Sequence, residues 1–319
     1  MRKSLTYKIL AAVMAVSAVN VFMPHNMLAY GITSDNTTIS TGTINENIYG
    51  NGHSFTINGD AVINGNVYGA INENSTDDVS GGNVTISGNA TINGNAEVTY
   101  AVYGGYSVGG EVYNNTVNIS GGSVDAVFGG YSHSGNTNNN TVNISGGSVG
   151  AVFGGYSGSG EVHHNTVNIS GDTVTGNVHG GWSNIGEAYD NTVNISNGTV
   201  RGYVFGGYIY YSGSVYDNEV IISGSADITN ANLYGRNDKA SGTGNTLTID
   251  GWKGNNGKGD CTVKSLNNFD SVNFDNLINL AQTTNFTVTD TVNNVGDVNI
   301  NSIAQVIIEA ARQKILHLL

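Results

Sequence analysis

Two aspartates at equivalent positions of adjacent sequence repeats are the residues best suited to catalysis. Asp190 and Asp217 directly precede the segments NTVNIS and NEVIIS. If these segments stack on each other, the two carboxyl groups lie about 5 Å apart, the spacing of a retaining glycosidase pair. The same position in the earlier repeats holds Asn114, Asn139 and His164, as expected for an exposed turn. We therefore favour a structural interpretation and keep a polysaccharide-degrading enzyme as the alternative hypothesis.

Other catalytic or metal-binding constellations are absent from the sequence. It has one cysteine, Cys261, and contains no paired-cysteine site, no HExxH segment and no phosphate-binding loop. One cysteine cannot form an internal disulfide, and the scarcity of cysteine favours bacterial export over a eukaryotic secretory route. We expect no metal site, no cofactor and no enzymatic activity.

Aromatic side chains that recur in VFGG-like segments are the candidate ligand-binding residues. The five that we select from this first aromatic column are Tyr103, Phe128, Phe153, His179 and Phe205. If the valines beside them point inward, strand alternation makes these rings point outward. Exposed apolar stripes often mark interaction surfaces, and sugars can pack their CH faces on aromatic rings. The competing structural interpretation is that a turn rotates the rings onto the core, or that the rings only stack on each other.

These residues belong to a repeat whose period is given by two independent marks. TVNIS-type segments begin at Thr116, Thr141, Thr166, Thr192, Glu219 and Thr246, in steps of 25, 25, 26, 27 and 27 residues. VFGGYS-type segments place their first glycine at Gly104, Gly129, Gly154, Gly180 and Gly206, in steps of 25, 25, 26 and 26 residues. The last ring of that segment forms a second aromatic column, Tyr106, Tyr131, Tyr156, Trp182 and Tyr208, whose facing stays open.

The repeat predicts an all-β fold, a parallel β-helix or β-solenoid with turns of about 25 residues. Each TVNIS segment alternates, with Val117 and Ile119 on one side and Thr116 and Asn118 on the other, which is strand periodicity. Units of this length cannot bury an apolar face alone and must stack on their neighbours. We expect a right-handed coil, the usual hand of β-crossovers. The asparagines before each strand should form a hydrogen-bonded ladder, at Asn115, Asn140, Asn165, Asn191, Asn218 and Asn245.

The charge distribution excludes one class of partner. The chain has 24 acidic against 11 basic side chains, a net charge of −13, and no Lys or Arg lies between Tyr30 and Val200. Binding to nucleic acid needs cationic side chains that neutralise phosphates. We therefore expect no nucleic-acid partner and no attraction to anionic lipid.

The two ends differ from the repeats. Residues 1–29 combine a basic start, MRKSLTYK, with a short apolar run and are interpreted as a secretory signal peptide. Residues 30–301 are assigned to the β-helix domain, with the clearest repeats over 83–250. Residues 302–319 have apolar spacing that predicts a short amphipathic C-terminal helix, or else form a truncation tail. No transmembrane segment is expected once the signal peptide is removed.

The chain resembles the passenger domains of bacterial autotransporter adhesins. The resemblance rests on the signal peptide, on GGNVTIS, NNTVNISGGSV and VFGGYS, and on the later NTLTIDGW and VKSLNNFDSVNF. It implies a secreted or cell-surface protein that adheres to host or neighbouring cells, with a host-cell glycan or protein, or another copy of itself, as partner. The family's C-terminal outer-membrane β-barrel has no counterpart after Asn301, so an outer-membrane location would require a barrel from elsewhere. Ice binding by the outward Thr, Asn and Ser side chains is a less favoured hypothesis.

Overall fold

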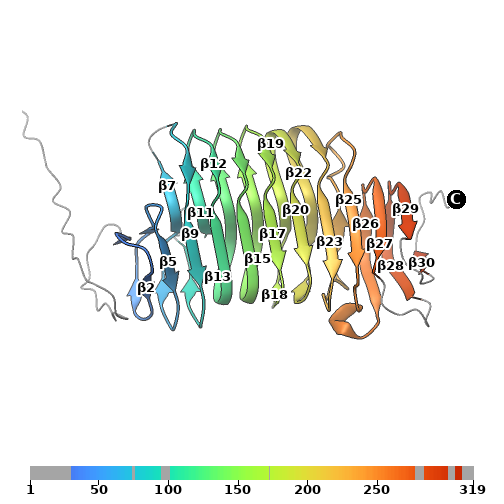
Figure 1. Ribbon diagram of the computed structural model, residues 1–319, viewed down its shortest axis with the longest axis horizontal. Helices are drawn as coiled ribbons and strands as arrows, with labels where there is room; N and C mark the ends of the chain where they lie inside the picture. The colour runs from blue at the N-terminus through green and yellow to red at the C-terminus, as the bar shows by residue number, and fades with distance from the viewer. Residues whose placement is uncertain are drawn as a thin grey trace, which may run out of the picture.

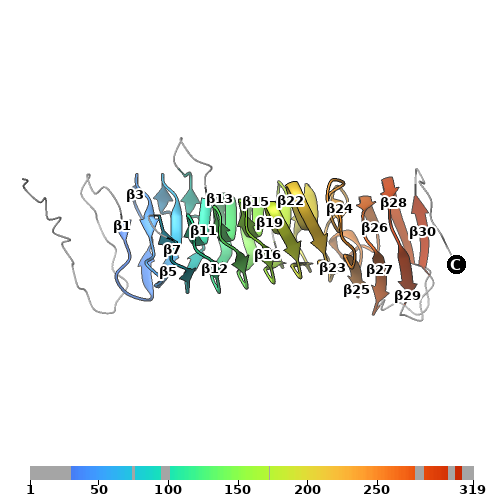
Figure 2. The ribbon, with the colours of Figure 1, turned by 90° about the horizontal axis from the view of Figure 1, so that it is seen from above.

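The chain forms one elongated stack of β-strand turns. The computed structural model describes residues 30–73, 76–94, 101–171, 173–276, 284–300 and 306–310. It is an all-β parallel solenoid of about nine turns, with 60% of the chain in strands and 1% helical. Figures 1 and 2 show the turns following one another along the long axis, from the blue N-terminal strands to the red C-terminal ones. The predicted fold class is confirmed.

One face of the solenoid, the TVNIS face, is built from the alternating strands of the first repeat mark. Every pair of neighbours is parallel, and Val117 pairs with Val142 in the register that the sequence columns predict. The strands in stacking order are β2 (Thr37–Ile39), β5 (Ser54–Ile57), β9 (Asn83–Ile86), the starts of β13 (Thr116–Ser132) and β15 (Thr141–Ser157), β17 (Thr166–Ile169), β20 (Thr192–Ile195), β23 (Glu219–Ser223), β25 (Thr246–Asp250), β27 (Ser271–Asp275) and β29 (Asp297–Ile300).

A second face, the VFGGYS face, carries the aromatic residues. Here Phe128 pairs with Phe153, and Tyr131 pairs with Tyr156, again in parallel. Its strands are β1 (Tyr30–Gly31), β4 (Ile48–Tyr49), β7 (Val67–Asn72), β11 (Ala101–Ser107), the ends of β13 and β15, the starts of β19 (Val178–Tyr189) and β22 (Tyr203–Tyr216), β24 (Asn232–Tyr234) and the ends of β26 (Cys261–Asn267) and β28 (Thr284–Asn293).

Short strands complete each turn. Between the two faces lie β3 (Thr43–Ile44), β6 (Val62–Ile63), β10 (Thr91–Ile92), β18 (Thr173–Val174), β21 (Thr199–Val200) and the middle of β13 and β15. The return path contains β8 (Val79–Ser80), β12 (Val112–Tyr113), β14 (Thr137–Asn138), β16 (Val162–His163) and the ends of β19 and β22. In the described part of the chain the only helical element is η1 (Asn255–Gly257). No described helix has the length and hydropathy that crossing a bilayer requires.

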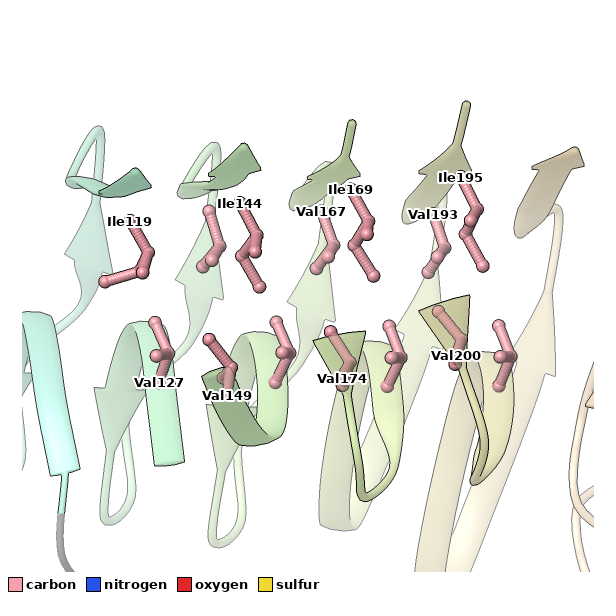
Figure 3. Close-up of a cluster of buried hydrophobic side chains, with 14 of the residues drawn as sticks. Ile119, Val127, Ile144, Val149, Val167, Ile169, Val174, Val193, Ile195 and Val200 are labelled. Carbon is pink, nitrogen blue, oxygen red and sulfur yellow. The ribbon is translucent and has the colours of Figure 1, made fainter. Parts of the chain in front are cut away.

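The core consists of aliphatic columns inside the coil. Val117, Ile119, Val127 and their counterparts in the next turns are essentially inaccessible to solvent. Figure 3 shows Ile119, Ile144, Ile169 and Ile195 in one row, facing Val127, Val149, Val174 and Val200 across the interior. Each buried Val or Ile contributes roughly 1.5–3 kcal/mol relative to an exposed side chain. The β-branched residues of TVNIS therefore both favour the strand and fill the interior.

The predicted asparagine ladder lies inside the coil, next to the corner formed by the Gly-Gly pairs. Asn140 donates from its backbone N–H and its Nδ2 to Oδ1 of Asn165, at 3.1 and 3.0 Å. The same pattern links Asn115 to Asn140, Asn165 to Asn191, Asn191 to Asn218 and Asn218 to Asn245. A Cβ on Gly130 would lie 2.4 Å from Nδ2 of Asn140, so the glycine makes room for the ladder.

The C-terminal end differs from the prediction. The helix expected over 302–319 is not confirmed, because Val306–Ala310 forms strand β30, which pairs in parallel with Thr284–Val288 of β28. Apolar spacing alone fits a helix, but a β-branched run next to an open parallel edge favours a further strand. The other residues of 302–319, like the signal peptide assigned to 1–29, lie outside the described residues.

Candidate functional site

The aromatic residues of the VFGGYS face form two neighbouring columns on its outer side. In the first aromatic column, ring centroids of successive turns are 4.5–5.5 Å apart from Tyr49 to Phe205. In the second aromatic column, Tyr106, Tyr131 and Tyr156 stack at 5.1 and 4.6 Å. The parallel register of β11, β13, β15, β19 and β22 places these rings above one another.

The exposure expected for the five candidate residues is wrong. Their rings do lie outside the main aliphatic core, but Tyr103, Phe128, His179 and Phe205 are only 4%, 7%, 1% and 7% exposed. Phe153 is half-buried. The cause is the second aromatic column, whose rings stand edge-on against the first: Tyr131 lies 5.5 Å from Phe128 at an interplanar angle of 84°. The two columns thus make a small hydrophobic core of their own.

Stacking also covers the ring faces on which a sugar would pack. Rings in the first aromatic column are nearly parallel from Tyr49 to Phe205, with interplanar angles of 4–13°. Tyr106, Tyr131 and Tyr156 are parallel within 9°. Each face is therefore covered by the ring of the next turn, which suits aromatic packing. Tyr49 and Phe153 in the first column and Tyr106, Tyr131 and Tyr156 in the second are half-buried, but stacking leaves little of their ring faces open to a ligand.

His179 is the polar member of the first aromatic column. It stacks between Phe153 and Phe205, at 5.0 Å and 4° from each. Neither ring nitrogen has a hydrogen-bond partner among the described residues. Burial lowers the pKa of His179 from 6.5 to about 3, because the charged imidazolium would lose its hydration. The side chain is therefore neutral at physiological pH and behaves as a flat apolar ring.

Among the described residues, the most exposed aromatic side chains lie in β22, at positions that the sequence did not lead us to select. Tyr211, Tyr203 and Tyr210 are 69%, 45% and 42% exposed. Tyr210 and Tyr211 follow the segment VFGGYI and lie where the pairing of β19 with β22 shifts register, between Ser183 and Ile185. The sequence signal was present: YIYYS replaces the YS that ends the earlier repeats. Figure 1 shows β22 in the C-terminal half of the rod.

These exposed rings adjoin the end of the second aromatic column. Tyr210 lies 6.2 Å from Trp182 at 18°, and Trp182 lies 4.2 Å from Tyr208. Tyr211 stands perpendicular to Tyr210, at 4.5 Å and 85°. Trp182 donates through Nε1 to Oδ1 of Asn184 at 2.8 Å, and Asn184 donates through Nδ2 to the Tyr156 hydroxyl at 2.9 Å. This hydrogen-bond chain fixes the Trp182 ring, against which Tyr210 packs.

The two aspartates that could form a catalytic pair lie at a position where the equivalent residues of successive turns share one backbone conformation. Asn114, Asn139, His164, Asp190 and Asp217 all have φ between 52° and 55°, the left-handed region that Asn, Asp and His tolerate best. All five are exposed, and the closest charge contact is His164 Nε2 to Asp190 Oδ2 at 3.6 Å. The turn interpretation is confirmed, and backbone conformation accounts for the residue types in this column.

The described residues contain no group of three or more His, Cys, Asp or Glu placed to hold a metal ion. Cys261 is buried, and desolvation raises the pKa of its thiol to about 11. Its side chain packs in the main core, as expected for a small apolar residue.

Comparison with known proteins does not assign the chain to a family. No protein-family model matches the sequence, and no curated protein or solved structure matches it either. Functional conclusions for this chain therefore rest on its sequence and its geometry.

Proposed function

We propose that the chain is an exported, non-enzymatic β-helix protein that mediates adhesion to host or neighbouring cells. Export is supported by the basic start and apolar run of residues 1–29. The resemblance of the repeats to autotransporter passengers supports a location in the medium or on a bacterial surface. A solenoid of about nine turns suits this role, because a long rod can hold contact residues away from the body that carries it.

The surface chemistry of the TVNIS face supports contact with neutral, polar partners. Outward asparagines bond to one another along the rod: Asn143 donates to Asn118 at 2.9 Å, and Asn168 donates to Asn143 at 2.8 Å. Asn194 continues the line to Asn168 at 2.8 Å. Repeated uncharged groups allow many weak contacts to act together, which raises avidity without any single strong site.

The observation that carries the proposal is the exposure of aromatic rings in β22. Tyr210 and Tyr211 are well exposed, whereas the earlier turns place their outward rings in packed columns. Tyrosine is enriched at recognition surfaces because it offers apolar area and a hydroxyl at a low entropy cost. An adhesive rod needs such residues, and a purely structural rod does not.

Adhesion can be tested with the purified full-length chain. Fluorescently labelled protein should bind epithelial cells or bacterial cells saturably, and unlabelled protein should compete. Lack of saturable binding to both cell types would refute the proposal. Release of reducing ends from polysaccharides, lost in Asp190→Asn, would instead favour the enzymatic alternative.

A further inference from the structure

We propose that the Tyr210 patch, formed by Trp182, Asn184, Tyr208, Tyr210 and Tyr211, binds neutral glycans by ring-face stacking. This inference rests on the proposed adhesive function and identifies the class of ligand. Elsewhere in the two aromatic columns, neighbouring turns cover the ring faces. At this patch the regular stacking ends, because β22 has one residue more than β19 between the paired positions, and Tyr210 and Tyr211 lie opposite the single residue Asn184.

The patch offers two ring orientations to a ligand. Tyr210 lies nearly parallel to Trp182, at 18°, while Tyr211 stands at 85° to Tyr210. Tyr211 is 69% exposed, and its ring can therefore contact a ligand. A pyranose presents apolar CH groups on one face and hydroxyls around its rim. Two perpendicular rings can therefore support the CH face of one sugar and the edge of the next.

Hydrogen-bonding groups surround these rings. Within the described part of the chain, the hydroxyls of Tyr208, Tyr210 and Tyr211 make no hydrogen bond, in contrast to Tyr189 and Tyr216, which donate to glutamates at 3.0 and 2.8 Å. Each free hydroxyl can donate once and accept from a sugar hydroxyl. Asn184 holds Trp182 and Tyr156 in place. The patch therefore combines apolar ring area with hydroxyl groups that have no partner in the described part of the chain, and a sugar can use both.

Charge selects a neutral ligand over a sialylated or sulfated one. The Lys239 ammonium lies 5.7 Å from the Tyr210 ring centroid, but Asp238 adjoins it in sequence and both are exposed. The chain as a whole carries a net charge of −13, which repels acidic sugars at long range. An acidic glycan would be attracted by the single Lys239 ammonium but repelled by the net negative charge of the protein. A neutral glycan is not repelled.

The test uses the full-length chain and an oligosaccharide array. The probes are short β-linked glucose and N-acetylglucosamine oligomers, sialyllactose, and a sulfated glycosaminoglycan. We expect binding to a neutral oligomer, and we expect Tyr210→Ser/Tyr211→Ser to weaken it about tenfold or more, since both stacking rings are lost. Tyr203→Ser is the control, because Tyr203 belongs to the same strand and is about as exposed as Tyr210 (45% against 42%) but lies outside the patch.

The outcomes separate this inference from the adhesive function. Equal weakening by Tyr203→Ser, or full binding by the double variant, would overturn the glycan site, as would preference for the acidic probes. Cell adhesion that persists in the double variant would contradict the patch and leave adhesion standing. Adhesion that is absent from the unmodified chain would contradict the proposed function. Circular dichroism of each variant checks that the solenoid is intact.

Discussion

At the scale of single residues, burial decides what each aromatic or ionisable group does. His179 replaces phenylalanine in a stacked column, and its unpartnered nitrogens are almost completely removed from solvent. In the unfolded chain the same imidazole titrates near its ordinary pKa of about 6.5. Because folding lowers the pKa to about 3, the folded state binds fewer protons than the unfolded state when the pH lies between about 3 and 6.5.

The first prediction is that His179 makes the solenoid sensitive to acid. Folding lowers the pKa of His179 to about 3. Above pH 6.5 the side chain is neutral in both the folded and the unfolded state, so its burial does not reduce the free energy of unfolding. Below pH 6.5 the unfolded state gains a proton that the folded state cannot bind, and the free energy of unfolding falls as the pH drops towards 3. At pH 5 the expected loss is about 2 kcal/mol relative to pH 8. Thermal unfolding followed by circular dichroism at both values measures it.

The variant His179→Phe should remove this part of the pH dependence, because phenylalanine occupies the same position in β15 and β22. His133→Asn is the control, since His133 is an exposed residue and its removal should leave the acid sensitivity unchanged. An unchanged difference between pH 8 and pH 5 in His179→Phe would show that other groups cause it.

At the scale of elements, two asparagines of the same turn allow a direct comparison. Asn165 is fully buried in the inner ladder, where Oδ1 accepts two hydrogen bonds from Asn140 and Nδ2 donates to Asn191 and to the backbone oxygen of Thr137. Asn168 belongs to the half-buried outward line. Two asparagines three residues apart thus differ in environment: Asn165 is shielded from water and Asn168 is partly exposed to it.

The second prediction is that Asn165→Ala costs about 2–3 kcal/mol, because it leaves buried donors on Asn140 without an acceptor. Asn168→Ala should cost well below 1 kcal/mol, since water can replace its bonds. Urea unfolding curves of both variants measure the free energy of unfolding. Equal losses would show that the inner ladder has no special role in stability.

Most of the fold could be predicted because stacking turns sequence columns into spatial columns. The period of 25 residues and the alternation of Val117 and Ile119 were enough to place the core and the asparagine ladder. The candidate site was less predictable, because exposure of Phe128 depends on a lateral neighbour, Tyr131, and alternation says nothing about lateral cover. The strand at Val306–Ala310 depends on the open edge of β28, which local apolar spacing does not reveal.

At the scale of the whole molecule, the solenoid is close to a one-dimensional array. Each turn contacts the turns before and after it, so stability should be roughly a sum of turn and interface contributions. Thr116 and Thr141 are register partners, as are Ile119 and Ile144. Removing residues 116–140 would therefore join Asn115 to Thr141 and keep every column in register.

The third prediction is that this excision folds into a shorter rod. The core columns and the asparagine ladder remain continuous across the junction, so the circular dichroism spectrum should stay that of a β-solenoid. The maximum dimension from small-angle X-ray scattering should fall by about 4.8 Å, the rise of one turn. Removal of residues 116–128, which is half a turn, should abolish folding, because it places Gly129 where a TVNIS strand must begin. If both deletions behave alike, register between turns does not determine this fold.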